Sequence, residues 1–189
     1  MKNLKFFLKI ATTIVVGFVM LASCLKSDDE KRPTPTKDEM TLYTLIMEYR
    51  QEKGLPEIPI SPALTHVAQV HAKDLQDHHV RGTACNMHSW SNKGNWTPCC
   101  YTADHAQAAC MWDKPREMSS YKGNGYEISH WNSAAATPAG SLNSWKSSSG
   151  HNAVIINEGT WASRPWRAIG IGIYGNYAVV WFGHESDER

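Results

Sequence analysis

The chain has 189 residues, of which 42% are hydrophobic and eight are tryptophan, so it can bury a core and does not have the composition of a disordered protein. Its formal charge is +1, but Lys2, Lys5 and Lys9 lie in a segment that we expect to be removed, which leaves the remaining chain slightly acidic. This balance excludes the basic field on which nucleic-acid binding depends, so no nucleic-acid partner is expected.

The first 23 residues have the pattern of a bacterial lipoprotein signal peptide. A lysine-rich start precedes a short apolar stretch over residues 10–20, whereas a membrane-spanning helix needs roughly 20 apolar residues. The tetrapeptide Leu-Ala-Ser-Cys that ends at Cys24 looks like a lipobox, in which cleavage occurs before a cysteine that is then acylated. The alternative is an uncleaved anchor with an incidental cysteine. We predict that the chain is exported and that lipid on Cys24 attaches it to the outer membrane.

Residues 24–36 are charged and contain prolines but have little to bury, which predicts a flexible tether. The acidic cluster at residues 27–30 is similar to signals that send lipoproteins to the cell surface in Bacteroidetes-like bacteria. We therefore expect exposure at the cell surface, with a periplasmic orientation as the alternative. A single domain is predicted over residues 37–185, followed by a tail at residues 186–189.

Two helices are predicted at the start of this domain. The first begins near Asp38, carries an apolar stripe and ends at Gly54. The second begins at Ser61-Pro62, where serine can cap the helix and proline suits its first position. His71 falls inside the apolar stripe of this second helix, so we interpret it as a core histidine rather than a ligand.

Four cysteines lie in a predicted insert at residues 85–110, and in an exported chain they indicate two disulfides. Three pairings are possible, of which the one that joins the adjacent Cys99 and Cys100 is the least favourable. We expect Cys85 to pair with Cys99, and Cys100 with Cys110; the third pairing stays open. A zinc site made from all four is disfavoured because the spacing contains no Cys-x-x-Cys pair.

The C-terminal half predicts a short helix near residues 111–118, an extended segment at Glu127, a loop at residues 129–141 and a polar loop that carries His151. A β-hairpin follows, in which isoleucines alternate with Gly170 and Gly172, and the second strand, residues 177–182, is apolar at every position. A strand buried on both faces beside two glycines predicts a thin sheet with helices packed on each side.

Several of these segments resemble one known family. The spacing W-x-x-x-S-G-H that ends at His151, the apolar run A-V-I-I after it, the hairpin G-I-G-I-Y and the early run Y-R-Q-E-K-G-L-P are similar to the CAP superfamily of cysteine-rich secretory proteins, antigen 5 and pathogenesis-related proteins, in its bacterial lipoprotein branch. The resemblance implies a single CAP (SCP-like) domain of the α+β class, built as a three-layer α-β-α sandwich around a small, mainly antiparallel sheet.

The resemblance also implies a cavity lined by histidines and glutamates. His88 matches the first histidine of the family, Glu127 a glutamate and His151 the second histidine, whereas Ser148 stands where a further glutamate is found in eukaryotic members. Two imidazoles and a carboxylate could hold a zinc-like ion with one position open to water, and zinc is the only cofactor that the pattern suggests.

Three functions follow. The first is a membrane-anchored module that binds a lipid, sterol-like, peptide or envelope ligand in this cavity, and it is the one we expect. The alternative is a zinc-dependent hydrolase, with His88 and His151 as ligands and Glu127 as base or third ligand. The last is a protein-interaction module with a vestigial cavity, whose cysteine-rich loop uses Trp90 and Trp96. A serine hydrolase is disfavoured, because no Gly-x-Ser-x-Gly elbow is present.

Overall fold

The computed structural model describes residues 33–187, so the predicted signal peptide, Cys24 and most of the tether lie outside the described residues. The described part of the chain forms helices, one short 3-10 helix (η1) and three strands, in the order α1 (Lys37–Glu52), α2 (Pro62–His78), α3 (Ala108–Trp112), α4 (Lys114–Met118), β1 (Gly125–Trp131), α5 (Pro138–Ser147), α6 (Ser149–Ile155), η1 (Gly159–Trp161), β2 (Ala168–Tyr174) and β3 (Tyr177–Gly183).

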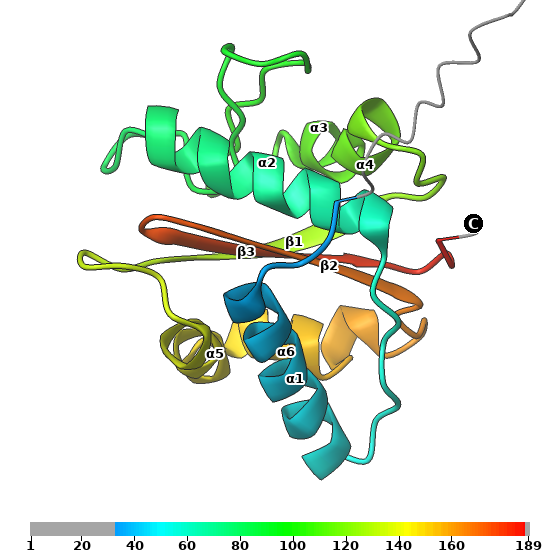
Figure 1. The fold of residues 1–189 in the computed structure, drawn as a ribbon. Coiled ribbons are helices and arrows are strands. Elements are labelled where there is room, and N and C mark those ends of the chain that lie inside the picture. The colour runs from blue at the N-terminus through cyan, green and yellow to red at the C-terminus, as the bar shows by residue number, and fades with distance from the viewer. Residues whose placement is uncertain (1–32, 188–189) are drawn as a thin grey trace, which may run out of the picture. The chain divides into compact units, whose positions relative to one another are not determined.

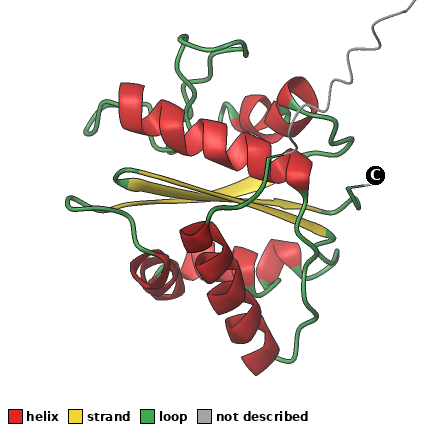
Figure 2. Ribbon diagram, in the orientation of Figure 1, coloured by secondary structure: helices red, strands yellow, loops and turns green. Residues whose placement is uncertain are grey.

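The three strands form one antiparallel sheet in the order β1-β3-β2. Helices α2, α3 and α4 lie on one face of the sheet, and α1, α5 and α6 lie on the other (Figures 1 and 2). Every residue of the central strand β3 is buried. The predicted three-layer α-β-α sandwich is therefore confirmed.

Both predicted N-terminal helices form, and each begins with a side-chain cap. Thr36 accepts a hydrogen bond from the backbone of Glu39, whose carboxylate in turn accepts one from the Thr36 backbone, so α1 opens with a capping box. Ser61 caps α2 through the Leu64 amide, with Pro62 at the first helical position. These caps satisfy amides that would otherwise lack partners at the helix ends.

Two glycines of β2 allow α2 to lie very close to the sheet. A Cβ atom placed on Gly170 would lie 2.0 Å from the backbone carbonyl carbon of Leu64, and one on Gly172 would lie 2.2 Å from the carbonyl oxygen of Ala68. A side chain at either position would therefore push the helix away. The β2–β3 turn contains Gly175, whose positive φ of 56° suits glycine in a tight hairpin.

Apolar side chains fill both interfaces between the sheet and its helices. The cluster on the α1, α5 and α6 side contains side chains from β1, β2 and β3, including Ile128, Ile169, Ile171, Val180 and Phe182. The cluster on the α2 side contains Leu64, Val67, Ala68, Val179 and Trp181. These two clusters hold the sheet between the helical layers.

The segment from residue 129 to 151 is more ordered than its sequence predicts. β1 continues to Trp131, and α5 begins at Pro138 with Thr137 as its cap, so the predicted loop at residues 129–141 is wrong at both ends. The predicted polar loop around His151 is also wrong, because His151 lies in α6. Burial of Leu142, Trp145 and Ile155 supplies the packing that these serine-rich and glycine-rich helices lack in intrinsic propensity.

The cysteines pair as Cys85–Cys100 and Cys99–Cys110, so the two disulfides are confirmed but the expected pairing is wrong. The backbones of Trp90 and Cys99 form an antiparallel bridge, and consecutive side chains of such an extended segment point to opposite sides. Cys99 therefore reaches Cys110 in α3, while Cys100 reaches Cys85 on the other side.

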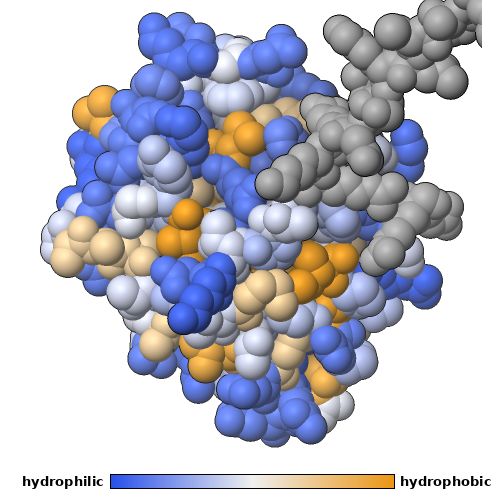
Figure 3. Space-filling model, viewed as in Figure 1, coloured by the Kyte–Doolittle hydropathy of each residue, from blue (hydrophilic) through white to orange (hydrophobic). Residues whose placement is uncertain are grey.

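The face seen in Figure 3 is largely hydrophilic, with apolar side chains scattered among polar ones. Within residues 33–187, no helix has the length and apolar character needed to cross a membrane.

Candidate functional site

Glu127 and His88 form the centre of the candidate site. Glu127 lies in β1, an edge strand, and His88 lies in the segment that follows α2 and is enclosed by the Cys85–Cys100 disulfide. The Nδ1 atom of His88 contacts the Oε2 atom of Glu127. The Glu127 side chain is completely buried, whereas that of His88 is 23% exposed, so His88 is the member of the pair that solvent can reach.

The two groups stabilise each other's charge. Burial by itself raises the pKa of Glu127, but the charge and hydrogen bond of His88, with smaller contributions from His71 and His151, hold this pKa below its ordinary value. Burial by itself lowers the pKa of His88, but the charge and hydrogen bond of Glu127 outweigh it and raise this pKa above its ordinary value. The pair therefore favours a carboxylate beside an imidazolium.

His71 lies beneath this pair. It is fully buried and stacks on Trp90, with ring centroids 4.2 Å apart. Its Nε2 atom is 3.1 Å from the Ser89 carbonyl oxygen, which can only accept, so Nε2 carries the proton and Nδ1 is an acceptor. That Nδ1 atom has no hydrogen-bond partner within residues 33–187, and neither has Oε1 of Glu127.

Burial lowers the pKa of His71 below its ordinary value, although the charge of Glu127 opposes that shift. His71 is thus the neutral core histidine that the sequence predicts. Its closeness to Glu127 was not predicted, because nothing in the helical stripe shows which strand the histidine faces.

His151 approaches from the opposite helical layer. It lies in the first turn of α6 and is partly buried. Burial lowers its pKa below the ordinary value, while the charge of Glu127 acts in the other direction and those of His88 and His130 add to the decrease. The charges of both members of the central pair thus act on the pKa of His151, although no hydrogen bond joins its ring to them in the described part of the chain.

Ser148, the other predicted cavity residue, lies at the junction of α5 and α6. Its amide donates to the Trp145 carbonyl at 3.1 Å, and its carbonyl accepts from the Asn152 amide at 2.8 Å. These are backbone contacts that connect the two helices, and they place Ser148 one helical turn before His151.

Two further residues near the candidate site are not indicated by the sequence: Tyr101, which packs against His88, and His130, which faces the opposite side of β1 from Glu127. Tyr101 lies edge-on to His88 with ring centroids 5.1 Å apart, and burial together with the charge of Glu127 raises the pKa of its hydroxyl. His130 belongs to β1, and its ring lies 6.4 Å from that of Trp145. The only sequence signal for His130 is its position three residues after Glu127.

The predicted residues do not fit a metal site as they stand. Glu127 occupies the Nδ1 atom of His88, and within residues 33–187 no three histidine, cysteine, aspartate or glutamate side chains are grouped so that they could hold an ion. A zinc site with an open water position requires three such ligands around one point. The arrangement fits a buried carboxylate that orients an imidazole.

Of the two tryptophans that the interaction-module alternative uses, Trp90 is buried and Trp96 is partly buried. Trp90 is 2% exposed and belongs to the core, and Trp96 packs edge-on against it with ring centroids 5.2 Å apart. Trp90 is wrongly predicted to be a surface residue, because its stacking on His71 and the adjacent disulfides draw the cysteine-rich segment onto α2.

Comparisons with known proteins agree with the observed architecture. A sequence model of the cysteine-rich secretory protein family, CAP, matches residues 43–178. No curated protein sequence matches the chain.

Three solved structures share the fold. An extracellular protein containing an SCP domain from Bacillus anthracis has a TM-score of 0.57 and 17% identity, with 78% of this chain and 40% of that chain covered. A cysteine-rich secretory protein from Staphylococcus aureus has a TM-score of 0.51 and 18% identity, with 80% and 40% covered. An outer surface protein from Borrelia burgdorferi has a TM-score of 0.53 and 19% identity, with 81% and 97% covered. The chain thus spans well under half of the first two proteins.

Proposed function

This chain belongs to the cysteine-rich secretory protein (CAP) family, and from that premise we propose that it is an exported binding protein which holds the anionic group of an amphiphilic envelope ligand against His88. The observation that carries the proposal is the pairing of a completely buried carboxylate with a histidine that is still 23% exposed. A buried charge is costly and adds little to packing, so such a pair is more often kept for function than for stability.

The chemistry of the pair defines the ligand. Glu127 binds Nδ1 of His88 and therefore leaves Nε2 for the ligand. Because the pKa of His88 is raised, its free Nε2–H is a charged donor over a wider pH range than that of an ordinary histidine. Such a donor favours an acceptor with negative charge, such as a carboxylate or a phosphate. His151, whose pKa is lowered by burial, supplies a second imidazole from the opposite helical layer.

Export is part of the same proposal. The relatives in Bacillus anthracis and Borrelia burgdorferi are described as extracellular and outer surface proteins, and the lipobox-like sequence that ends at Cys24 supports attachment through lipid. A domain at the envelope surface would meet amphiphiles with anionic head groups.

The proposal is tested by titrating the full chain in detergent-free nanodiscs with three C12 probes that differ only in the head group: dodecanoate, dodecyl phosphate and dodecanol. We expect saturable stabilisation, measured as a rise in the melting temperature, with the two anions and not with the alcohol. The effect should disappear in His88→Gln and persist in the control His66→Gln, which changes a histidine of α2 away from the site.

The binding should also weaken as the pH rises through the raised pKa of His88, because the charged donor is then lost. Equal binding of all three probes, or full binding by His88→Gln, would contradict the proposal.

A further inference from the structure

The two disulfides differ in their access to solvent. Cys99 is 4% exposed and belongs to the core cluster beneath α2, and its partner Cys110 is partly buried. In the other bridge Cys100 is exposed and Cys85 is partly buried. A reagent in solution can therefore reach the Cys85–Cys100 bridge more readily than the Cys99–Cys110 bridge.

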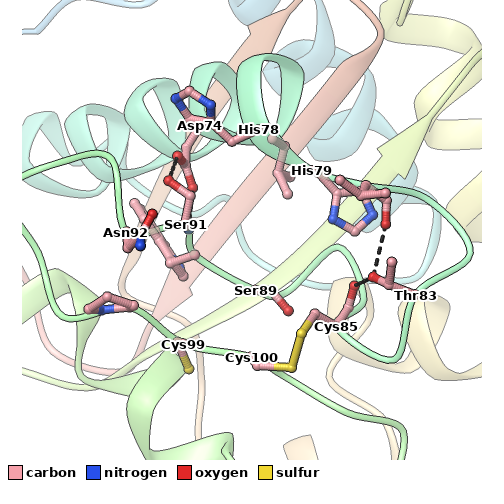
Figure 4. Close-up of a pocket in the computed structure, with 14 residues that line it drawn as sticks. Asp74, His78, His79, Thr83, Cys85, Ser89, Ser91, Asn92, Cys99 and Cys100 are labelled. Carbon is pink, nitrogen blue, oxygen red and sulfur yellow. Dashed lines mark hydrogen bonds between the residues drawn. A yellow bond between two sulfur atoms is a disulfide. The ribbon is translucent and has the colours of Figure 1, made fainter.

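Both cysteines of the exposed bridge, together with the neighbouring Cys99, lie in the wall of a pocket of about 510 Å³ between the C-terminal end of α2 and the cysteine-rich segment (Figure 4). Leu75, Val80 and Pro98 contribute apolar walls. The polar groups of the pocket are largely occupied by one another, since both Asp74 oxygens accept hydrogen bonds from Ser91. The pocket thus leaves room beside the sulfur atoms for the thiol-bearing loop of another molecule.

The segment from His79 to His88 depends strongly on this bridge. It contains no helix or strand, and residues 80–84 are exposed. Its other attachments to the domain are single contacts: the Asn86 amide donates to the Tyr101 carbonyl, Arg81 stacks on Trp131, and His88 contacts Glu127. The rings of His79 and His88 also lie edge-on to Tyr177 and Tyr101, and Met87 packs against the cluster on the α2 side.

The chain that follows His88 is held by contacts other than the disulfide. Trp90 is in the core, and Ser91 is bound by Asp74 of α2. Loss of the Cys85–Cys100 bridge would therefore loosen the chain before Ser89 and leave the chain after it in place.

We propose that Cys85–Cys100 is a site of thiol–disulfide exchange with a dithiol oxidoreductase, and that its opening releases His88 from Glu127. A thiolate of the reductant attacks Sγ of the exposed Cys100, the bond between the two cysteines breaks, and Cys85 leaves as a thiolate that takes a proton from water. The second thiolate of the reductant then attacks its own sulfur in the mixed disulfide and releases Cys100. The reductant becomes a disulfide, so two electrons pass to the bridge.

The inference goes beyond the proposed function and needs no ligand for its test. The full chain is treated under native conditions with dithiothreitol and, separately, with reduced thioredoxin. Free cysteines are then alkylated and identified by peptide mass spectrometry, in which Cys24 is detected on a separate peptide. We expect Cys85 and Cys100 to be alkylated at least about tenfold faster than Cys99 and Cys110. Equal reactivity of the two bridges, or resistance of both, would overturn the inference.

The release of His88 is measured by trypsin cleavage after Arg81, with the cleavage sites in α1 as internal controls. Reduction should accelerate this cleavage by at least about tenfold without changing the far-ultraviolet circular dichroism. The variant Cys85→Ser/Cys100→Ser should be cleaved fast without reductant, whereas Cys99→Ser/Cys110→Ser should still need it. If either variant fails to fold, the wild-type chain treated with increasing reductant provides the test. An unchanged rate of cleavage after Arg81, once Cys85–Cys100 is fully reduced, would show that His88 is not released.

Discussion

The two faces of the sheet are built on different physical principles. The face toward α1, α5 and α6 is packed with large aliphatic and aromatic side chains, among them Ile171, Val180 and Phe182. The face toward α2 combines glycines, which bring the helix close, with buried polar groups such as Glu127 and Ser129, opposite the buried His71.

Because a buried charge requires a partner, the α2 face can hold Glu127 only where the disulfide-closed segment supplies His88. The comparison shows a division between the two faces. One face stabilises the domain through large apolar contacts, and the other combines close helix packing with the candidate site. Five substitutions test that division, from the largest expected effect to the smallest.

Gly170→Val should prevent α2 from docking. The added Cβ alone would lie 2.0 Å from the Leu64 backbone, and backbone cannot move aside as a flexible side chain can. We expect a loss of more than about 4 kcal/mol in the free energy of unfolding, above the usual range for overpacking because the clash is with backbone. Urea denaturation followed by tryptophan fluorescence measures it. Gly150→Val is the control, since nothing lies within 4 Å of its added Cβ. A stable Gly170→Val domain would show that the layers are not held at this distance.

Trp145→Ala and Trp90→Ala compare the two faces directly. Both side chains are buried, at 0% and 2% exposure, so each truncation should cost about 3 kcal/mol or more. Only Trp90→Ala removes the ring on which His71 stacks. Histidine NMR titration should therefore show a changed His71 in Trp90→Ala and an unchanged one in Trp145→Ala. Identical histidine titrations in the two variants would mean that the faces are not distinct.

Glu127→Gln should cost about 2 kcal/mol, because it removes a charged hydrogen bond from a buried pair. The pKa of Glu127 is depressed, so its contribution is present above the ordinary value of 4.5 and is lost as the pH falls through the depressed pKa. The pKa of His88 is raised, so its contribution is complete below the ordinary value of 6.5 and is lost as the pH rises through the raised pKa.

The difference in unfolding free energy between wild type and Glu127→Gln should therefore be greatest between these two ordinary values and decrease on either side. Chemical denaturation across the pH range measures it, with the exposed Glu48→Gln as control. A difference that does not depend on pH would show that the pair is not charged.

Thr36→Ala removes the capping box of α1 and should cost about 1 kcal/mol. Thr44→Ala on the same helix is the matched control, because Thr44 only returns a hydrogen bond to the Met40 carbonyl within the helix. The melting temperature of Thr36→Ala should be lower than that of Thr44→Ala. The opposite order would indicate that α1 is stabilised by packing alone.

The parts of the fold that the sequence predicts are those with local signals. The cap at Ser61 and the alternation of glycine and isoleucine in β2 are readable without knowledge of the tertiary structure, whereas the cap at Thr36 falls in the segment that the sequence predicts to be a tether. α5 and α6 were missed because their serines and glycines favour turns, and only the burial of Trp145 and Ile155 in the assembled domain supports the helices.

The site residues His88, Glu127 and His151 are predicted from the resemblance to known CAP domains. Their spacing in the sequence alone does not show that they lie near one another. The disulfide pairing was mispredicted because it depends on which side of the chain each of two adjacent cysteines faces. The place of His71 beside Glu127 depends on how α2 lies across β1, a tertiary relation that no local pattern contains.

The hydrogen bonds at the edges of the sheet affect how readily the domain could aggregate by strand pairing. Along β2, Ile169 exchanges hydrogen bonds with the chain at residues 59–61, and the Ile173 amide donates to the buried carboxylate of Glu39. Along β1, the Ser129 carbonyl accepts from the Trp145 indole. Several backbone groups of β2, and one of β1, that could pair with a strand of another molecule are thus occupied. A second copy of the domain would find these positions already taken, which opposes strand exchange between copies.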